Sequence, residues 1–221
     1  MKNILFLLSV LLPAIEFSAN ASQPEAEEAP FRRYMSLGVE LAGPAMHFIA
    51  PETFVLSASA DLEIRPNLMA ALELGNAQVN VKQPAAEYNV SGQFFRIGAN
   101  YNLLQQNPAI HGNQIFMFLR YAASFNTHDA PVVQLIDPVW GNQEVSFDQL
   151  SYQAHWAEVG AGLRTRIFHN FFLGWNVRAA FMISQTDNES TKPFFVSGFG
   201  RNQNNTQFIF QYFIYYRIPT K

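Results

Sequence analysis

Residues 154–184 alternate between apolar and polar side chains over two consecutive runs, and this pattern limits the folds open to the chain. One column of alternate residues is apolar except for His155 and Thr165. The other column contains glycine and polar or charged residues: Glu158, Gly160, Gly162, Arg164, Arg166, Gly174, Asn176 and Arg178. A period of two indicates β-strands rather than helices. Because His169-Asn170 separates the runs, they predict a long hairpin with a tight turn.

Six further segments alternate in the same way and predict strands over 34–42, 55–65, 68–76, 92–103, 115–126 and 207–219. Each arm of the 154–184 hairpin has about a dozen residues, which suits a tilted crossing of a bilayer by roughly 9–11 residues. The first, third, fifth and seventh connections are predicted to be long and the others shorter, an asymmetry typical of outer-membrane barrels. We therefore predict an all-β fold, an eight-stranded antiparallel up-and-down transmembrane β-barrel over residues 34–221.

The polar column is expected to face the barrel lumen. It contains five acidic residues and seven arginines: Glu40, Asp61, Glu63, Glu73, Glu158, Arg65, Arg96, Arg120, Arg164, Arg166, Arg178 and Arg217. One arginine at the middle of a bilayer costs about 2–4 kcal/mol, so this column must avoid lipid. The chain has ten arginines and four lysines, and arginine is the better residue for fixed, desolvated ion pairs. The alternative, a soluble carrier with its apolar column inside, is disfavoured for the same reasons.

An eight-stranded barrel is only wide enough for side chains to fill it. The lumen charges are therefore interpreted as a structural ion-pair network and not as a permeation path. The residues predicted to form this network are Glu40, Glu63, Glu73, Arg96, Arg120, Glu158, Arg164 and Arg178.

The N-terminal residues predict export. Residues 1–21 have the layout of a signal peptide: a basic start at Lys2, an apolar core, and an Ala-x-Ala cleavage site at 19–21. Residues 22–33 are acidic and contain two prolines, which indicates a flexible periplasmic segment. The predicted location is the bacterial outer membrane. With an even number of strands, both termini would lie in the periplasm.

Composition excludes several classes of function. The chain has no cysteine, so it has neither a disulfide framework nor a thiolate metal site nor a cysteine nucleophile. Its net charge is −3 without a basic tract, and no nucleic-acid partner is expected. The five histidines are scattered without paired ligand spacing, so neither a metal nor a cofactor is predicted.

Several phrases resemble an uncharacterised outer-membrane β-barrel family, a domain of unknown function typical of Bacteroidetes. They are ALELG at 71–75, FFRIGANYNLL at 94–104, LRYAASF at 119–125, AHWAEVGAGLR at 154–164, NFFLGWNVR at 170–178 and QYFIYYRIP at 211–219. The resemblance spans almost the whole mature chain. It implies the barrel fold and the membrane location, and it brings no active site with it.

Small barrels can also be enzymes that modify lipids with a Ser–His pair. Ser151 and His155, with Asp148 nearby, are the nearest match. Residues four apart on an extended chain are separated by about 13 Å, which is too far for a hydrogen bond. We therefore predict no catalytic residues.

The segment 127–153 is predicted to be a long external loop and the part that carries any function. Its candidate partner-binding residues are Val132, Val133, Leu135, Ile136 and Trp140. An apolar stretch in an external loop can bind a surface protein or a glycolipid. Alternatively, the loop folds over the barrel mouth as a lid, which is the interpretation we favour.

These observations predict a monomeric, non-enzymatic barrel in outer-membrane lipid with a structural or interaction role. The main alternative is an envelope lipid-modifying enzyme, an acyltransferase or deacylase with a site at the barrel rim. A soluble periplasmic carrier is the third.

Overall fold

The computed structural model describes residues 34–83, 86–104, 112–137, 141–186 and 193–219. The predicted signal peptide at 1–21 and the predicted flexible segment at 22–33 lie outside these residues. Within the described ranges, no helix is both long and apolar enough to cross a membrane.

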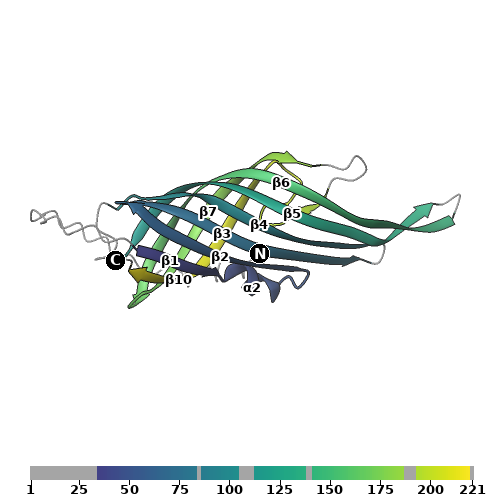
Figure 1. Cartoon of the computed structure of the whole chain (residues 1–221). Helices are drawn as coiled ribbons and strands as arrows, with labels where there is room; N and C mark the ends of the chain where they lie inside the picture. Colours follow the sequence, from purple (N-terminus) through teal and green to yellow (C-terminus); the bar gives the residue numbers. More distant parts are fainter. Residues whose placement is uncertain (1–33, 84–85, 105–111, 138–140, 187–192, 220–221) are drawn as a thin grey trace, which may run out of the picture. The chain divides into compact units, whose positions relative to one another are not determined.

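Eight antiparallel strands close into a barrel in the order β1-β10-β7-β6-β5-β4-β3-β2 (Figure 1). The strands are β1 (Tyr34–Glu40), β2 (Thr53–Arg65), β3 (Leu68–Gln83), β4 (Ala86–Asn102), β5 (Gln114–Asp137), β6 (Gly141–Phe168), β7 (Phe171–Gln185) and β10 (Thr206–Pro219). Sequential strands are neighbours, and β1 closes the ring by pairing with β10. The predicted fold class is confirmed.

Alternation sorts the side chains of the wall as predicted. The apolar column faces outward, with large exposed residues on most strands: Leu37, Leu62, Leu72, Ile97, Leu119, Val159, Val177 and Phe210. The inward column is buried and polar. Its buried charged members are five carboxylates and five arginines: Glu40, Asp61, Glu63, Glu73, Glu158, Arg96, Arg120, Arg164, Arg178 and Arg217. Opposite charges therefore balance among these buried residues.

One arginine departs from the predicted column. Arg65 is exposed and pairs with Leu68 on the outward side of β3. In contrast, Arg166, although exposed at the rim, stays on the lumen side, opposite Phe172 and over its ring. The ladder between β2 and β3 shifts register between Glu63 and Arg65, and the ladder between β6 and β7 shifts between Arg166 and Phe168. A bulge changes which side of the sheet the following residue faces. The simple period of two therefore fails at this end of the barrel.

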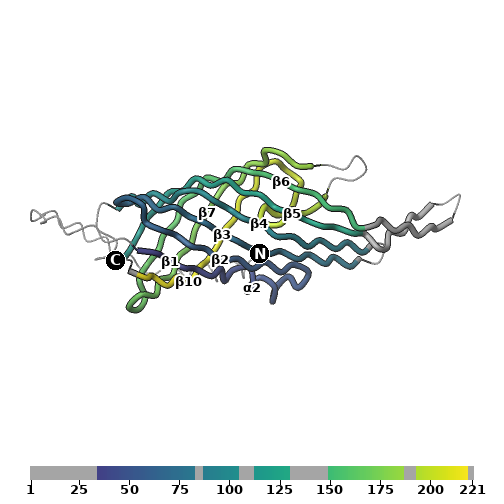
Figure 2. Tube along the Cα trace, viewed as in Figure 1, coloured from purple at the N-terminus to yellow at the C-terminus, as the bar shows by residue number. Residues whose placement is uncertain are grey.

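Two predicted long loops are instead extensions of strands. The β3–β4 ladder continues to the pair Gln83↔Ala86, and the β5–β6 ladder to the pair Asp137↔Gly141. The segment 127–153 is thus mostly a β-hairpin, and both its interpretation as a loop and the favoured lid are wrong. Figure 2 shows β3 to β6 running on past the ends of the other strands.

Residues 193–205, in the connection between β7 and β10, pack into the barrel. It contains a short hairpin, β8 (Phe195–Val196) and β9 (Gly200–Arg201). Val196, Ser197 and Phe199 are at most 1% exposed. We call residues 193–205 the plug segment.

Strand β1, the neighbour of β10, is only seven residues long and is followed by the helix α2 (Ala42–His47). Gly43 donates its backbone N–H to both carboxylate oxygens of Glu40, at 3.0 and 2.8 Å, which fixes the turn from strand to helix.

Candidate functional site

Two carboxylates organise the centre of the lumen. Glu73 on β3 pairs through Oε1 with Nη1 of Arg96 at 2.7 Å and through Oε2 with Nη1 of Arg120 at 2.9 Å. Glu158 on β6 pairs through Oε1 with Nε of Arg96 at 2.9 Å and through Oε2 with Nη1 of Arg178 at 3.1 Å. Arg178 also lies 3.6 Å from Glu73. These five side chains form one cluster, which we call the central cluster.

Neutral donors complete the two carboxylates. Ser57 Oγ and Gln211 Nε2 donate to Glu73 Oε1 at 2.8 and 2.9 Å. Trp156 Nε1 donates to Glu158 Oε1 at 2.7 Å. Both carboxylates are at most 1% exposed. A buried charge is tolerated only when it is paired and hydrogen-bonded, and both conditions hold here.

A second pair lies closer to the end of the barrel where Tyr34 pairs with Pro219. Arg164 on β6 donates to the carboxylate of Asp61 on β2, and its guanidinium stacks 3.8 Å from the ring centroid of Tyr215. Asn100 joins this pair to the central cluster, because it donates to Asp61 at 3.3 Å and accepts from Arg120 at 3.3 Å. The lumen network therefore spans strands on opposite sides of the ring.

Two residues of the predicted network lie elsewhere in the lumen. Glu40 is buried, but its hydrogen bonds go to the backbone of Gly43. Glu63 is also buried, and among the described residues it forms no ion pair with Arg96, Arg120, Arg164 or Arg178. Asp61, in contrast, belongs to the network although it was not among the predicted members. Its partner Arg164 is 103 residues away in the sequence. The alternation therefore predicted that Asp61 faces the lumen, but not its position along the barrel axis.

The plug segment seals the network from one end. Arg96 Nη2 donates to the backbone oxygen of Gly198 at 2.6 Å, and the backbone N–H of Ser197 donates to Asn126 Oδ1 at 3.0 Å. Phe199 packs edge-on against Trp156 with the ring centroids 5.8 Å apart. The sequence signal for this contact is the apolar Phe194–Val196 run within a polar, glycine-containing connection.

The extension of β5 and β6 is the second candidate site. Val132, Val133, Leu135 and Ile136 belong to β5, and Trp140 lies outside the described residues. Pairing of β6 with β7 ends at Ala154↔Gln185, and Thr186 N donates to Gln153 O at 2.9 Å. Beyond this point, no strand in the described part of the chain pairs with that side of β6. We call Gly141–Tyr152 the free edge.

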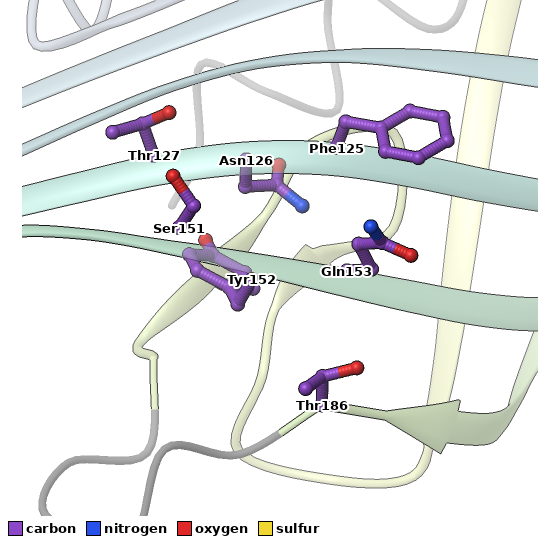
Figure 3. Close-up of a pocket in the computed structure, with 7 residues that line it drawn as sticks. All are labelled: Phe125, Asn126, Thr127, Ser151, Tyr152, Gln153 and Thr186. Carbon is purple, nitrogen blue, oxygen red and sulfur yellow. The ribbon is translucent and has the colours of Figure 1, made fainter.

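A hollow of about 310 Å³ lies at the foot of the free edge (Figure 3). It is lined by Phe125, Asn126, Thr127, Ser151, Tyr152, Gln153 and Thr186. Polar side chains follow one another here on neighbouring strands, whereas the wall below exposes large apolar residues. The hollow therefore marks the level at which the outward face changes from apolar to polar.

The geometry does not assemble a Ser–His site. His155 Nδ1 lies 2.7 Å from the hydroxyl of Tyr121, and the two rings are stacked. Among the described residues, Ser151 has no hydrogen bond to His155. No group of three or more His, Asp or Glu residues in the same part of the chain is placed to hold a metal ion.

Solved structures with the same fold are outer-membrane barrels. A major outer membrane protein from Thermus thermophilus matches with a TM-score of 0.52 at 10% identity, covering 85% of this chain and 98% of that one. Ail, the attachment invasion locus protein of Yersinia pestis, matches with a TM-score of 0.44 at 8% identity, covering 85% of this chain and 98% of that one. At 10% identity, the likeness to the Thermus thermophilus protein extends to the fold alone.

The sequence comparisons agree with the expected family. A family model described as a domain of unknown function (DUF6048) matches residues 2–221. No curated protein matches the chain. The resemblance to an uncharacterised family is therefore confirmed.

Proposed function

We propose that this chain, which belongs to the DUF6048 family, is a closed, non-enzymatic anchor in the bacterial outer membrane that presents its external hairpin to a partner. In this proposal both termini are periplasmic, and the extended ends of β3 to β6 stand outside the cell. The observation that supports it best is the free edge of β6 above a filled lumen.

A free strand edge offers a row of unpaired backbone N–H and C=O groups to an extended segment of another protein. At about 3.3 Å per residue, the free edge is roughly 40 Å long. Register shifts between His128 and Val133 twist the hairpin, and Glu144 and Asp148 lie on β6. Bulges and charges are common protections of edge strands against unselective pairing, so the expected partner is a specific surface protein.

The filled lumen argues against transport. The central cluster, the Asp61–Arg164 pair and the plug segment occupy the interior along its length. Breaking one buried pair leaves an unpaired charge and costs about 3–5 kcal/mol, so these contacts hold the barrel in one state. The proposed role of the network is therefore structural.

The alternative, an envelope lipid-modifying enzyme, lacks a supporting geometry. A nucleophilic hydroxyl needs a base within hydrogen-bond reach. The best candidate base, His155, is paired with Tyr121 on the outer face of the wall.

Photo-crosslinking from the free edge in intact cells tests the proposal. A photoreactive residue is placed at Gln149 or Ser151, both exposed on β6, and at Leu119, which is 66% exposed on the lipid-facing wall. We expect discrete protein adducts from the first two positions only. They should vanish when residues 131–146 are replaced by Asn-Gly, which keeps the pair Ala130↔Phe147. Equal adducts from Leu119, or adducts that survive the shortening, would contradict the proposal.

A further inference from the structure

The barrel wall has a gap beside β1. Strand β10 pairs with β1 only from Phe213 to Pro219, and β2 pairs with β1 only from Ala58 to Leu62. Residues 206–211 of β10 and 53–57 of β2 therefore have no ladder partner on this side within the described chain. The helix α2 lies along this stretch in place of a strand, as the trace in Figure 2 shows.

The helix is fastened to only one side of the gap. His47 Nδ1 lies 3.1 Å from the backbone oxygen of Thr53 at the start of β2. On the β10 side, the backbone N–H of Leu41, the residue before α2, donates to Tyr212 O at 2.7 Å, and no hydrogen bond among the described residues joins α2 itself to β10. Past Leu41, the seam between α2 and β10 therefore has no backbone ladder in the described chain.

A cavity of about 340 Å³ lies at this seam and reaches the lumen. Met46, Ala50 and Phe210 line its outer end, and all three are exposed on the outside of the barrel. Phe94 and Phe199, which are buried in the lumen, line its inner part. The cavity therefore connects the outer surface of the wall with the interior, and its volume is at the lower end of the ligand-pocket range.

The outer end of the cavity faces the membrane. Strand β1 has seven residues, which at about 3.3 Å each and a tilt of about 45° place its end roughly 16 Å from its start. The apolar band of such barrels is about 25 Å tall, so the seam lies within it. Around the seam, Phe48 is 90% exposed, Ile49 is 73% exposed and Phe208 is 83% exposed. A ligand would therefore enter from lipid.

The inner end of the cavity is charged. Arg96, Arg178 and Glu40 line it, which gives two guanidinium groups and one carboxylate. The Glu40 carboxylate already accepts two hydrogen bonds from Gly43. Arg178 is 2% exposed, and its Nε has no hydrogen-bond partner. A buried guanidinium with an unused donor favours an acceptor that is itself anionic.

We propose that this cavity binds an acyl chain with an anionic head group, taken up sideways from the membrane. The chain lies between Phe94, Phe199 and Phe210, and the head group accepts a hydrogen bond from Arg178. A free fatty acid and an anionic phospholipid share this chemistry. This binding site is separate from the free edge of β6 and does not depend on it.

Quenching of tryptophan fluorescence by a brominated chain tests the proposal. Trp156 contacts Phe199 inside the lumen, so the other two of the three tryptophans are changed in the variant Trp140→Phe/Trp175→Phe. This protein is reconstituted in phosphatidylcholine bilayers and titrated with dibromostearic acid, its methyl ester, or a dibromo-phosphatidylglycerol. Ala50→Phe fills the outer end of the cavity. Ala45→Phe is the matched control, because Ala45 is exposed on α2, five residues before Ala50, and does not line the cavity.

We expect saturable quenching by the acid, with a half-saturating mole fraction about tenfold lower than for the ester, the difference one charged hydrogen bond makes. Ala50→Phe should abolish saturation and Ala45→Phe should leave it unchanged. Quenching by phosphatidylglycerol equal to that by the acid identifies a phospholipid as ligand, and its absence identifies a free fatty acid. If quenching instead rises linearly with the mole fraction of brominated lipid, and does so equally in Ala50→Phe and Ala45→Phe, the proposed site is overturned. Equal quenching by the acid and the ester would overturn the proposed recognition of an anionic head group. This comparison uses the same protein for both ligands and needs no further substitution.

Discussion

Replacing Glu158 by Gln removes one of the two carboxylates of the central cluster while keeping the shape of the side chain. The amide oxygen can still accept from Arg96 or Trp156, but the amide NH₂ cannot pair with Arg178, which now lies 3.1 Å from a donor. Arg96, Arg120 and Arg178 are then left with Glu73 alone.

The cost follows from leaving a guanidinium uncompensated in a site without solvent. Removing one partner of a buried ion pair costs about 3–5 kcal/mol. Because Gln retains one hydrogen bond, we expect a value near the lower limit, about 3 kcal/mol. For a chain of this size, that corresponds to a decrease of roughly 6–12 °C in the unfolding midpoint.

Heat-modifiable gel migration of the purified protein measures this midpoint, and urea unfolding in lipid vesicles measures the free energy. Glu87→Gln is the matched control, since Glu87 pairs with Lys82 at 3.1 Å where the lysine side chain is 75% exposed. Exposed pairs contribute about 0–1 kcal/mol. A Glu158→Gln midpoint within 2 °C (roughly the effect of such a surface pair) of the Glu87→Gln midpoint would refute the structural role of the network.

Three further single variants and one double variant probe the lumen by the same unfolding assays. Phe199→Ala should cost about 3–5 kcal/mol, because the plug segment loses its contact with Trp156; an unchanged free energy would show that the plug segment does not pack there. Gly75→Ala should cost about 1–3 kcal/mol, since its Cβ would overlap the ring of Phe94; wild-type stability would contradict this packing. Asp61→Asn should lower the free energy of unfolding by about 3 kcal/mol, because it leaves Arg164 without its carboxylate partner. The double variant Asp61→Asn/Arg164→Met should recover part of this loss. If the losses of the two single variants simply add, the two residues are not coupled and the prediction is wrong.

Alternation predicts the membrane-spanning part of the fold because lipid imposes it. A side chain that faces the bilayer must be apolar, and a charged side chain must face the lumen. The sequence alone therefore assigns Leu72 to the outer face and Glu73 to the inner face. The same rule located the lumen and most of its charges. It fails at Arg65, where a register shift near the rim changes the side without any change in composition.

Above the membrane, the strands lose the constraint that made them recognisable. In the proposed orientation, both faces of the β5–β6 hairpin beyond Asn126 are free of lipid, so the residues there need not alternate. The segment 127–153 therefore resembles a loop in sequence although its backbone is paired. The gap in the wall beside β1 was equally impossible to predict from the sequence. It becomes visible only when the pairing shows which residues of β2 and β10 lack a partner beyond the end of β1.

The plug segment was beyond prediction for a different reason. Its stability depends on contacts with Arg96, Asn126 and Trp156, which come from three separate strands. Local sequence shows only an apolar run followed by glycines. The identity of the residue that each lumen charge contacts is likewise decided by barrel closure, as the 103-residue separation of Asp61 and Arg164 illustrates.

Cysteine labelling in intact cells tests the closed lumen most directly, because the chain has no cysteine of its own. Ser197→Cys places a thiol in the plug segment at a fully buried position, and Asn204→Cys places one at an exposed position of the same connection. With a membrane-impermeant maleimide, we predict labelling of the Asn204→Cys variant and none of the Ser197→Cys variant until the protein is unfolded by heat. Equal labelling of the two variants in the folded state would contradict a barrel that is sealed at its external end.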